Sequence, residues 1–349
     1  MKLFIPGRLC LFGEHSDWAG GYRRIDRSLE KGYTLIVGTN QGIYAQVKPH
    51  PTHFIFRSSQ GPAIELPMEP EILLDEARGG GFFSYAAGVA YQVLTHHAVG
   101  GVEIHNDRTD LPIAKGLSSS AALCVLVARA FNRSYSLKLR VEEEIELAYR
   151  GERTTPSRCG RMDFGCAYGG QPILTIFDGD LTEILPLTVS RDLFFAIVDL
   201  GASKNTREIL ARLDRCYPLA EDALCQNVRH YLGAINRQIV QNAVTALQEG
   251  DARQIGCLMK QAQAEFDRYI MPACPSQLSA PTLHHLLSYP RLQPYIFGGK
   301  GVGSQGDGTA QFIAKDVRSQ QQIIEIIQED FPQMRCLKLT MSTSLSQED

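Results

Sequence analysis

Three short segments of the chain contain residue types that could handle a phosphorylated small molecule. The first, residues 116–122, reads GLSSSAA, and an almost wholly apolar run at helical spacing follows it. The first backbone N–H groups of a helix have no partners within the helix, and together with the helix dipole they form an anion site. A serine hydroxyl there can cap the helix or bind a magnesium ion held by phosphates. The segment therefore indicates either a phosphate-binding loop or an ordinary capped, buried helix.

A second segment, PGRLCLFGEHSDWAGG at residues 6–21, concentrates charged residues between glycines. Arg8, Glu14, His15 and Asp17 lie within ten residues of sequence. The carboxylates can accept hydrogen bonds from adjacent hydroxyls, and the histidine can donate or accept one. Such a cluster suits a sugar or another polyol, and a solvated polar turn is the alternative.

A third segment, CGRMDFGCAYGG at residues 159–170, surrounds Asp163 with glycines and with small or apolar residues. A carboxylate in such surroundings needs a partner, and Arg8 is a candidate. An arginine beside an aspartate keeps the carboxylate ionised. The two residues therefore form either a functional pair or a structural salt bridge.

Composition limits the classes of partner. Of 349 residues, 35 are basic and 38 acidic, which gives a net charge of −3, and the basic residues form no long run. Nucleic acid and anionic membranes are therefore not expected as partners. Pro6 and Gly7 interrupt the N-terminus before a signal-peptide stretch could form, and no segment approaches the roughly 20 apolar residues of a membrane span. Nine scattered cysteines favour reduced thiols in the cytoplasm over a disulfide framework.

Strand and helix patterns are mixed along the chain. Apolar alternation and β-branched runs predict strands at 33–40, 42–49, 53–59, 100–107 and 193–200. Helical spacing predicts helices at 82–97, 119–132 and 318–330, and two helices within 219–270 that break near 249–254. A further strand is expected after the glycine-rich residues 298–308. Because the elements do not alternate as regular βαβ units, we expect an α+β fold, with a domain boundary near residues 185–192.

Together the three segments resemble the motifs of the GHMP kinase superfamily, which includes galactokinase, homoserine kinase, mevalonate kinase and phosphomevalonate kinase. PIAKGLSSSA matches its pattern P-x-x-x-G-L-x-S-S-A, and GRLCLFGEHSD resembles the galactokinase form G-R-x-x-x-x-G-E-H-x-D. GGKGVGSQGDGTAQF, at 298–312, resembles the glycine-rich third motif. The resemblance implies two domains. Residues 1–188 would form an ATP-binding domain like ribosomal protein S5 domain 2, and residues 189–349 a ferredoxin-like domain.

The resemblance also implies an activity and the residues that carry it. We expect an ATP-dependent kinase, a monomer or homodimer, that phosphorylates a sugar hydroxyl, and the anomeric one in particular. Arg8 and Asp163 would be the catalytic pair. Sugar contacts are expected from Glu14, His15, Asp17 and Gly160. ATP contacts are expected from Lys115, Gly116, Leu117, Ser118, Ser119, Ser120 and Ala121, and Mg²⁺ ligands from Ser120 and Glu152.

The chain departs from the galactokinase pattern near the expected sugar pocket. Galactokinases usually have asparagine in place of Cys10, tyrosine in place of Trp18 and glutamine in place of Phe164, so galactose is not inferred as the substrate. Arg23 and Arg24 could face an acidic substituent of the substrate or form a solvated basic turn.

The third motif is also a variant of the family pattern. Lys300 could contact the nucleotide phosphates, and Asp307 matches no role that the resemblance supplies.

Other functions compete for the same residues. Within the superfamily, the alternative is a mevalonate-type or other small-alcohol kinase. On the same scaffold, the alternative is a non-catalytic sensor of sugar and ATP, and the intact Arg8 and Asp163 argue against it. GVGSQG at 301–306 spells the dinucleotide pattern G-x-G-x-x-G, but a strand-like run follows where that fingerprint requires a helix. The sequence has no Walker motif G-x-x-x-x-G-K-[ST], which disfavours a P-loop ATPase.

Overall fold

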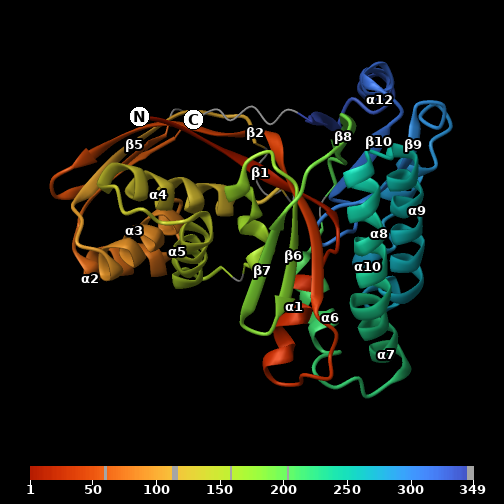
Figure 1. Ribbon diagram of the computed structural model, residues 1–349, viewed down its shortest axis with the longest axis horizontal. Helices are drawn as coiled ribbons and strands as arrows, with labels where there is room; N and C mark the ends of the chain where they lie inside the picture. The colour runs from red at the N-terminus through yellow and green to blue at the C-terminus, as the bar shows by residue number, and fades with distance from the viewer. Residues whose placement is uncertain (59–60, 112–116, 158, 203, 344–349) are drawn as a thin grey trace. The chain divides into compact units, whose positions relative to one another are not determined.

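The computed structural model describes residues 1–58, 61–111, 117–157, 159–202 and 204–343 (Figure 1). The chain divides into two compact units: unit 1 contains residues 1–8 and 38–170, and unit 2 contains residues 9–37 and 171–349. Two of the boundaries fall inside strands β1 (Lys2–Phe12) and β2 (Gly32–His50), so both strands contribute to both units. The division at residues 188/189, which the resemblance implies, stays a prediction.

Unit 1 combines paired strands with a group of helices. Strand β3 (His53–Ser58) pairs antiparallel with β4 (Ala63–Pro67) and parallel with β5 (Gly101–Thr109). Strand β5 in turn pairs antiparallel with residues 43–50 of β2. In Figure 1 a group of helices lies on one side of these strands. They are α2 (Pro70–Gly79), α3 (Ser84–His96), α4 (Ser119–Tyr135) and α5 (Val141–Thr154).

Small residues set the close packing of these helices. A Cβ atom at Gly88 of α3 would lie 2.3 Å from the backbone oxygen of Gly151 in α5. Helix α4 buries Ala121, Ala122 and the apolar residues that follow, because its sequence is apolar on nearly every side. The 3-10 segment η2 (Arg161–Tyr168) follows α5 and packs on both α4 and α5. This packing positions Asp163 beside the start of α4.

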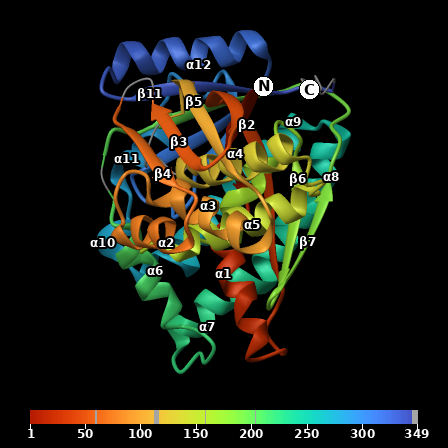
Figure 2. The same ribbon diagram turned by 90° about the vertical axis from the view of Figure 1, so that its left-hand side faces the viewer.

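The second unit contains a four-stranded antiparallel sheet with the order β11-β8-β10-β9. Its strands are β8 (Leu193–Asp199), β9 (Ile296–Gly301), β10 (Thr309–Ala314) and β11 (Arg335–Met341). Helices α9 (Ala252–Tyr269) and α12 (Val317–Asp330) pack on this sheet, and Figure 2 shows α12 lying along β11. A second pairing joins β6 (Ile173–Asp178) to residues 32–36 of β2 and to β7 (Leu181–Pro186).

The remaining helices of unit 2 line two cores, because the last of them packs on the sheet through Leu283 and Leu286 while others share a separate core. They are α1 (Ser16–Gly21), η1 (Tyr22–Arg24), α6 (Thr206–Asp214), α7 (Ala223–His230), the π-helical turn η3 (Tyr231–Ile235), α8 (Asn236–Glu249), η4 (Met271–Ala273), α10 (Pro275–Leu278) and α11 (Pro281–Leu287). Ile209, Val228 and Phe266 are buried together in the separate core. Cys216 and Cys225 are joined as a disulfide in the same core, because the turn between α6 and α7 brings their Cα atoms to 4.6 Å. The expectation of reduced thiols is therefore wrong for these two, and seven other cysteines are free.

Most predicted elements are present, with two informative differences. The runs 33–40 and 42–49 are parts of one 19-residue strand, β2, rather than two strands. Residues 298–301 belong to strand β9, whereas the sequence pattern predicts a strand only after the glycine-rich residues 298–308, where β10 lies. Here the ladder with β10 overrides the weak intrinsic preference of glycine for strands. Within the described ranges, no helix is both long enough and apolar enough to cross a membrane.

Candidate functional site

In unit 1 the structure brings together the two residues expected to form a catalytic pair. Arg8, on β1, donates from Nη2 to Oδ1 of Asp163 in η2. The Ser118 hydroxyl donates to the same oxygen at 2.8 Å. Among the described residues, no contact ends on Oδ2 of Asp163, and its side chain is 25% exposed. One carboxylate oxygen is therefore held by two donors, and the other is available to a ligand.

Ser118 occupies the point where the serine-rich segment becomes helix α4. Its backbone is left-handed, with φ of 58°, and its hydroxyl makes no capping bond to the helix. The neighbouring Leu117 carbonyl accepts a hydrogen bond from the Arg8 backbone N–H at 3.0 Å, which ties this turn to β1. Helix α4 begins at Ser119, so its first N–H groups are free of side-chain caps and suited to an anion. Lys115 and Gly116 lie outside the described residues.

Glu152, the expected Mg²⁺ ligand on α5, is almost completely buried, with 1% exposure. Burial and, to a lesser extent, the negative charge of Asp163 raise its pKa to about 7, against hydrogen bonds from Ser157, Ser120 and Cys159 that act in the other direction. The Ser157 hydroxyl donates to Oε1 of Glu152 at 3.1 Å. The structure thus brings together Ser120 and Glu152, the two expected metal ligands.

The oxygen ligands present here fit a magnesium ion. Ser120 and Glu152 supply a hydroxyl and a carboxylate, the hard ligands that Mg²⁺ prefers, and a cation would relieve the repulsion between Glu152 and Asp163. In the part of the chain that the structure describes, no three or more His, Cys, Asp or Glu side chains gather as a metal site. Mg²⁺ bound by one or two protein ligands usually completes its coordination with waters and substrate phosphates.

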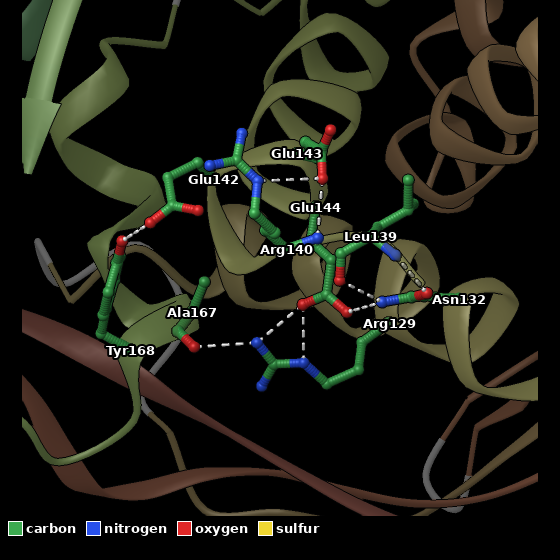
Figure 3. Close-up of polar contacts among 9 residues, drawn as sticks. All are labelled: Arg129, Asn132, Leu139, Arg140, Glu142, Glu143, Glu144, Ala167 and Tyr168. Atoms are coloured by element: carbon green, nitrogen blue, oxygen red, sulfur yellow. Dashed lines mark hydrogen bonds and ion pairs between the residues drawn. The ribbon is translucent and has the colours of Figure 1, made fainter. Parts of the chain in front are cut away.

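A buried polar network fixes η2 relative to α4 and α5, as Figure 3 shows. Arg129 of α4 donates from Nε to Oε2 of Glu144 at 2.8 Å, and from Nη2 to the backbone oxygen of Ala167 at 2.8 Å. Asn132 donates from Nδ2 to Oε1 of Glu144 at 2.7 Å. At the end of η2, Tyr168 donates to Glu142 of α5 at 2.6 Å. The network holds the segment that carries Asp163.

In unit 2 the expected sugar contacts Glu14 and His15 lie on the turn between β1 and α1, and Asp17 lies in the first turn of α1. We call residues 13–17 the acceptor loop. Gly13 has φ of 100° and His15 has φ of 67°, both in the left-handed region. At Gly13 a Cβ atom would lie 2.1 Å from the Tyr33 backbone oxygen, so only glycine fits there. Glu14 and His15 are buried and Asp17 is half-buried.

His15 is held as a neutral ring. Its Nδ1 accepts a hydrogen bond from Nε1 of Trp18 at 3.2 Å, and its ring stacks on Phe266. Burial and, to a lesser extent, the positive charges of Lys204 and Lys300 lower the pKa of His15 to about 4, against a hydrogen bond with the Ser304 backbone that raises it. The ring is therefore uncharged near neutral pH, with the Trp18 contact fixing which nitrogen accepts.

Other residues singled out in the sequence have structural partners. Arg23 donates from Nε to Oδ1 of Asp178 at 2.6 Å, which favours the structural alternative for this residue, while Arg24 is exposed. Asp307 accepts hydrogen bonds from the backbone N–H of Leu283 and the hydroxyl of Thr282, so it caps the start of α11.

Cys10 and Phe164, two of the positions that differ from the galactokinase pattern, each have contacts within their own unit. Cys10 is buried, and its thiol donates to the Phe12 carbonyl at 3.3 Å. Phe164 packs edge-on against Tyr149 in the interior of unit 1. Gly160 precedes η2, and its carbonyl accepts from the Asp163 backbone N–H at 3.4 Å.

Sequence reasoning missed two contacts at these sites. It did not predict that the hydroxyl of Ser118 binds Asp163, and the expected contact of Ser118 with the nucleotide stays a prediction. It suggested that Lys300 contacts nucleotide phosphates, whereas its Nζ binds Glu14 and its side chain is 1% exposed. A lysine between glycines of an otherwise apolar strand was the available signal, because a buried ammonium requires a counter-charge.

Comparisons with known proteins define the class. Residues 84–170 match the family described as GHMP kinases N terminal domain. A galactokinase of Thermococcus kodakarensis is 27% identical over 300 residues, which cover 78% of this chain and 80% of the relative. The crystal structure of Lactococcus lactis galactokinase complexed with galactose superposes with a TM-score of 0.75 at 18% identity, covering 97% of this chain and 92% of that one. The Methanococcus jannaschii mevalonate kinase superposes with a TM-score of 0.73 at 16% identity, covering 99% and 98%.

The fold is therefore the two-domain GHMP kinase fold, and the expected α+β class is confirmed. The resemblance to the GHMP kinase superfamily is confirmed as well, through the matched N-terminal domain and the galactokinase relatives. The chain therefore contains a GHMP kinase N-terminal domain and is similar to galactokinases, which are phosphotransferases with an alcohol group as acceptor. Kinases of this class take the phosphoryl group from ATP.

Proposed function

We propose that this kinase phosphorylates a sugar, at its anomeric hydroxyl, with Arg8 and Asp163 as the catalytic pair. The observation that carries the proposal is the arrangement at Asp163, whose Oδ1 accepts from Arg8 and Ser118 while its side chain, 25% exposed, offers Oδ2 to a ligand. An anomeric hydroxyl is more acidic than an ordinary alcohol. It therefore places a modest demand on a carboxylate that already receives two hydrogen bonds.

In this proposal Asp163 orients the acceptor hydroxyl and receives its proton on Oδ2 as the new P–O bond forms. Phosphoryl transfer proceeds through a loose transition state, so the protein mainly positions the reactants and stabilises charge. Arg8 fixes the carboxylate and supplies positive charge beside the reacting groups. Ser118 restricts the carboxylate to one orientation, because it donates to the oxygen that Arg8 also holds.

The start of α4 is the proposed phosphate site. Leu117, Ser118, Ser119, Ser120 and Ala121 surround N–H groups that can bind phosphate oxygens, and Lys115 and Gly116 are proposed to extend the loop. Ser120 and Glu152 would hold Mg²⁺, which would offset the negative charge of the phosphate groups. The pKa of Glu152 is about 7, so the carboxyl is partly protonated near neutral pH. It must lose this proton before it can bind a cation.

The acceptor loop is the proposed sugar site, with Gly160 as a further contact. Asp17 and Glu14 are carboxylates suited to hydroxyl donors, and neutral His15, whose Nδ1 accepts from Trp18, can donate one hydrogen bond from Nε2. Hydrogen bonds of this kind are strongly selective, because an analogue without the hydroxyl leaves buried polar groups unpaired.

The proposal is tested by ADP release from MgATP with a panel of hexoses, pentoses, uronic acids, heptoses and mevalonate. Asp163→Asn is assayed beside the wild type, and Asp178→Asn serves as a matched control, because Asp178 also pairs with an arginine, Arg23. We expect turnover with a sugar, a loss of about a hundredfold or more in Asp163→Asn, and retained turnover in Asp178→Asn. Identification of the phosphorylated carbon by ³¹P and ¹³C NMR tests the anomeric assignment.

Two other outcomes of this assay have distinct meanings. Turnover with mevalonate alone supports the alternative of a small-alcohol kinase. This chain shares the fold of the Methanococcus jannaschii mevalonate kinase. Binding of ATP and a sugar without turnover supports the sensor. Either result would overturn the proposed sugar kinase.

A further inference from the structure

The acceptor loop has a backbone that side chains rarely adopt, and several groups of unit 2 hold it in place. His15 is left-handed without being glycine, which is strained and persists only where surrounding contacts over-determine it. Trp18 donates to the His15 ring, and Asn236 of α8 donates to the Ser16 hydroxyl. The loop is therefore preorganised within unit 2 rather than shaped by solvent.

The strongest of these supports comes from Lys300 in the glycine-rich motif. Its Nζ donates to Oε1 of Glu14 and to the backbone oxygen of Gly301, the second at 2.7 Å. The Lys300 side chain is 1% exposed and the Glu14 side chain 4%. An ammonium group buried to this extent is stable only beside an opposite charge, so the lysine and the carboxylate stabilise each other as ions.

The backbone around Lys300 is itself fixed. Strand β9 pairs with β10 on one side, with Lys300 opposite Gln311. On the side of α9, Gln263 accepts a hydrogen bond from the Gly301 N–H at 2.8 Å. Gln311 also donates to the carbonyls of Cys10 and Leu11, so the end of β1 that leads into the acceptor loop is tied to the same strands. The backbone that carries Lys300 is therefore held in place on both sides where its side chain contacts Glu14.

Two chemical consequences follow for a ligand at the loop. An ionised carboxylate only accepts hydrogen bonds, whereas a protonated one also donates, so Lys300 makes Glu14 selective for hydroxyl donors. The contact also restricts Glu14 to one orientation, which lowers the ordering cost of binding.

We propose that Lys300 is a positioning residue for the sugar acceptor, because it holds Glu14 ionised and oriented toward a hydroxyl of the sugar. This inference rests on the proposed sugar-kinase function. It assigns the lysine of the variant third motif to recognition of the acceptor, away from the nucleotide. Lys300 acts through Glu14 and makes no contact with the sugar itself.

The test compares Lys300→Met, Glu14→Gln and the double variant in the full-length enzyme, with the panel sugar of highest kcat/KM as acceptor. We expect KM for the sugar to rise about tenfold or more in each single variant, while KM for ATP changes less than about twofold. Both single variants leave a buried charge unpaired, so a lower Tm is expected. The double variant contains neither charge, and its Tm should recover toward the wild-type value while its KM for the sugar stays raised.

Lys31→Met is the matched control, because Lys31 also forms an ion pair in unit 2, with Asp178, but its side chain is 43% exposed. It should change neither the sugar KM nor the ATP KM. Recovery of both Tm and sugar KM in the double variant would show that the pair is only structural and would overturn the inference. An unchanged sugar KM in Lys300→Met, or a raised ATP KM instead, would overturn it as well. If Lys300→Met does not fold, the sugar KM of the double variant decides.

The two proposals fail in different ways. A wild-type enzyme without turnover on any panel sugar defeats the proposed function and this inference with it. Wild-type turnover with a sugar KM that does not respond to loss of Lys300 defeats this inference alone.

Discussion

Replacing Glu152 by glutamine should stabilise the protein in the absence of ligands, and by an amount that depends on pH. The pKa of this carboxyl is raised from its ordinary value of 4.5 to about 7 in the folded protein, chiefly because it is buried and secondly because Asp163 is nearby. Between pH 4.5 and 7 the unfolded chain has lost the proton and the folded chain retains it. The free energy of unfolding therefore falls as pH rises through this window, and the loss is complete above pH 7.

The size of the effect follows from the shift. A shift from 4.5 to about 7 corresponds to about 3 kcal/mol at pH 8, and to about 1 kcal/mol at pH 5.5. Glutamine carries no charge and can still accept the hydrogen bond that Ser157 donates to Oε1. Glu152→Gln should therefore exceed the wild type in unfolding free energy by about 3 kcal/mol at pH 8 and by less than about 1 kcal/mol at pH 4.5.

Urea denaturation at a series of pH values measures this difference directly. Glu71→Gln removes a carboxylate from an exposed position of α2 and should change the unfolding free energy by no more than about 0.5 kcal/mol. Addition of Mg²⁺ at pH 8 should stabilise the wild type and leave Glu152→Gln unchanged, because only the ionised carboxylate binds the ion. A gap between Glu152→Gln and wild type that is equal at pH 4.5 and pH 8 would refute the reasoning.

Three further changes test the packing and the charges in denaturation experiments. Arg129→Leu leaves buried Glu144 without its arginine and should lower the unfolding free energy by about 3–5 kcal/mol, and a loss below 1 kcal/mol would contradict a buried ion pair. Gly88→Ala forces a Cβ atom to 2.3 Å from a carbonyl of α5 and should destabilise by about 1–3 kcal/mol, whereas Gly79→Ala meets no atom within 4 Å and should be neutral or stabilising. The free energy of unfolding of the wild type should fall by about 3 kcal/mol as pH falls from 6.5 to 4, because the histidine gains a proton in the unfolded chain before it does in the folded one. His15→Gln should remove this loss. An unchanged pH dependence would exclude His15 as its source.

Much of the local structure could be predicted because its signals are short-range. Helical periodicity located α3, α4 and α12, and the run at 193–200 located β8. The lengths of strands were harder to predict, since β2 continues through residue 41, where the local pattern separates two strands. In that strand the ladders with β5 and β6 decide, and no local pattern contains them.

The site shows the same division between local and long-range information. Gly13 and the serine run mark a tight turn and the start of a helix, which follow from the residues themselves. Arg8 and Asp163 lie 155 positions apart, and their pairing was expected only because the chemistry of each residue needs a partner. The contact of Ser118 with Asp163 had no such signal, because a serine at a helix start has several possible partners.

The sequence by itself determined the resemblance to GHMP kinases: three motifs in the order of that superfamily, and the residue types for phosphate, sugar and cation. Only the tertiary structure decided which partner each charge takes. Lys300 is bound to Glu14 across 286 positions, and Glu152 is buried close enough to Asp163 to retain its proton near pH 7. The physical reason is that burial makes an unpaired charge costly, so the fold must assign every buried charge a counter-charge or a proton. That assignment depends on distances and solvent exclusion, which no spacing along the chain contains.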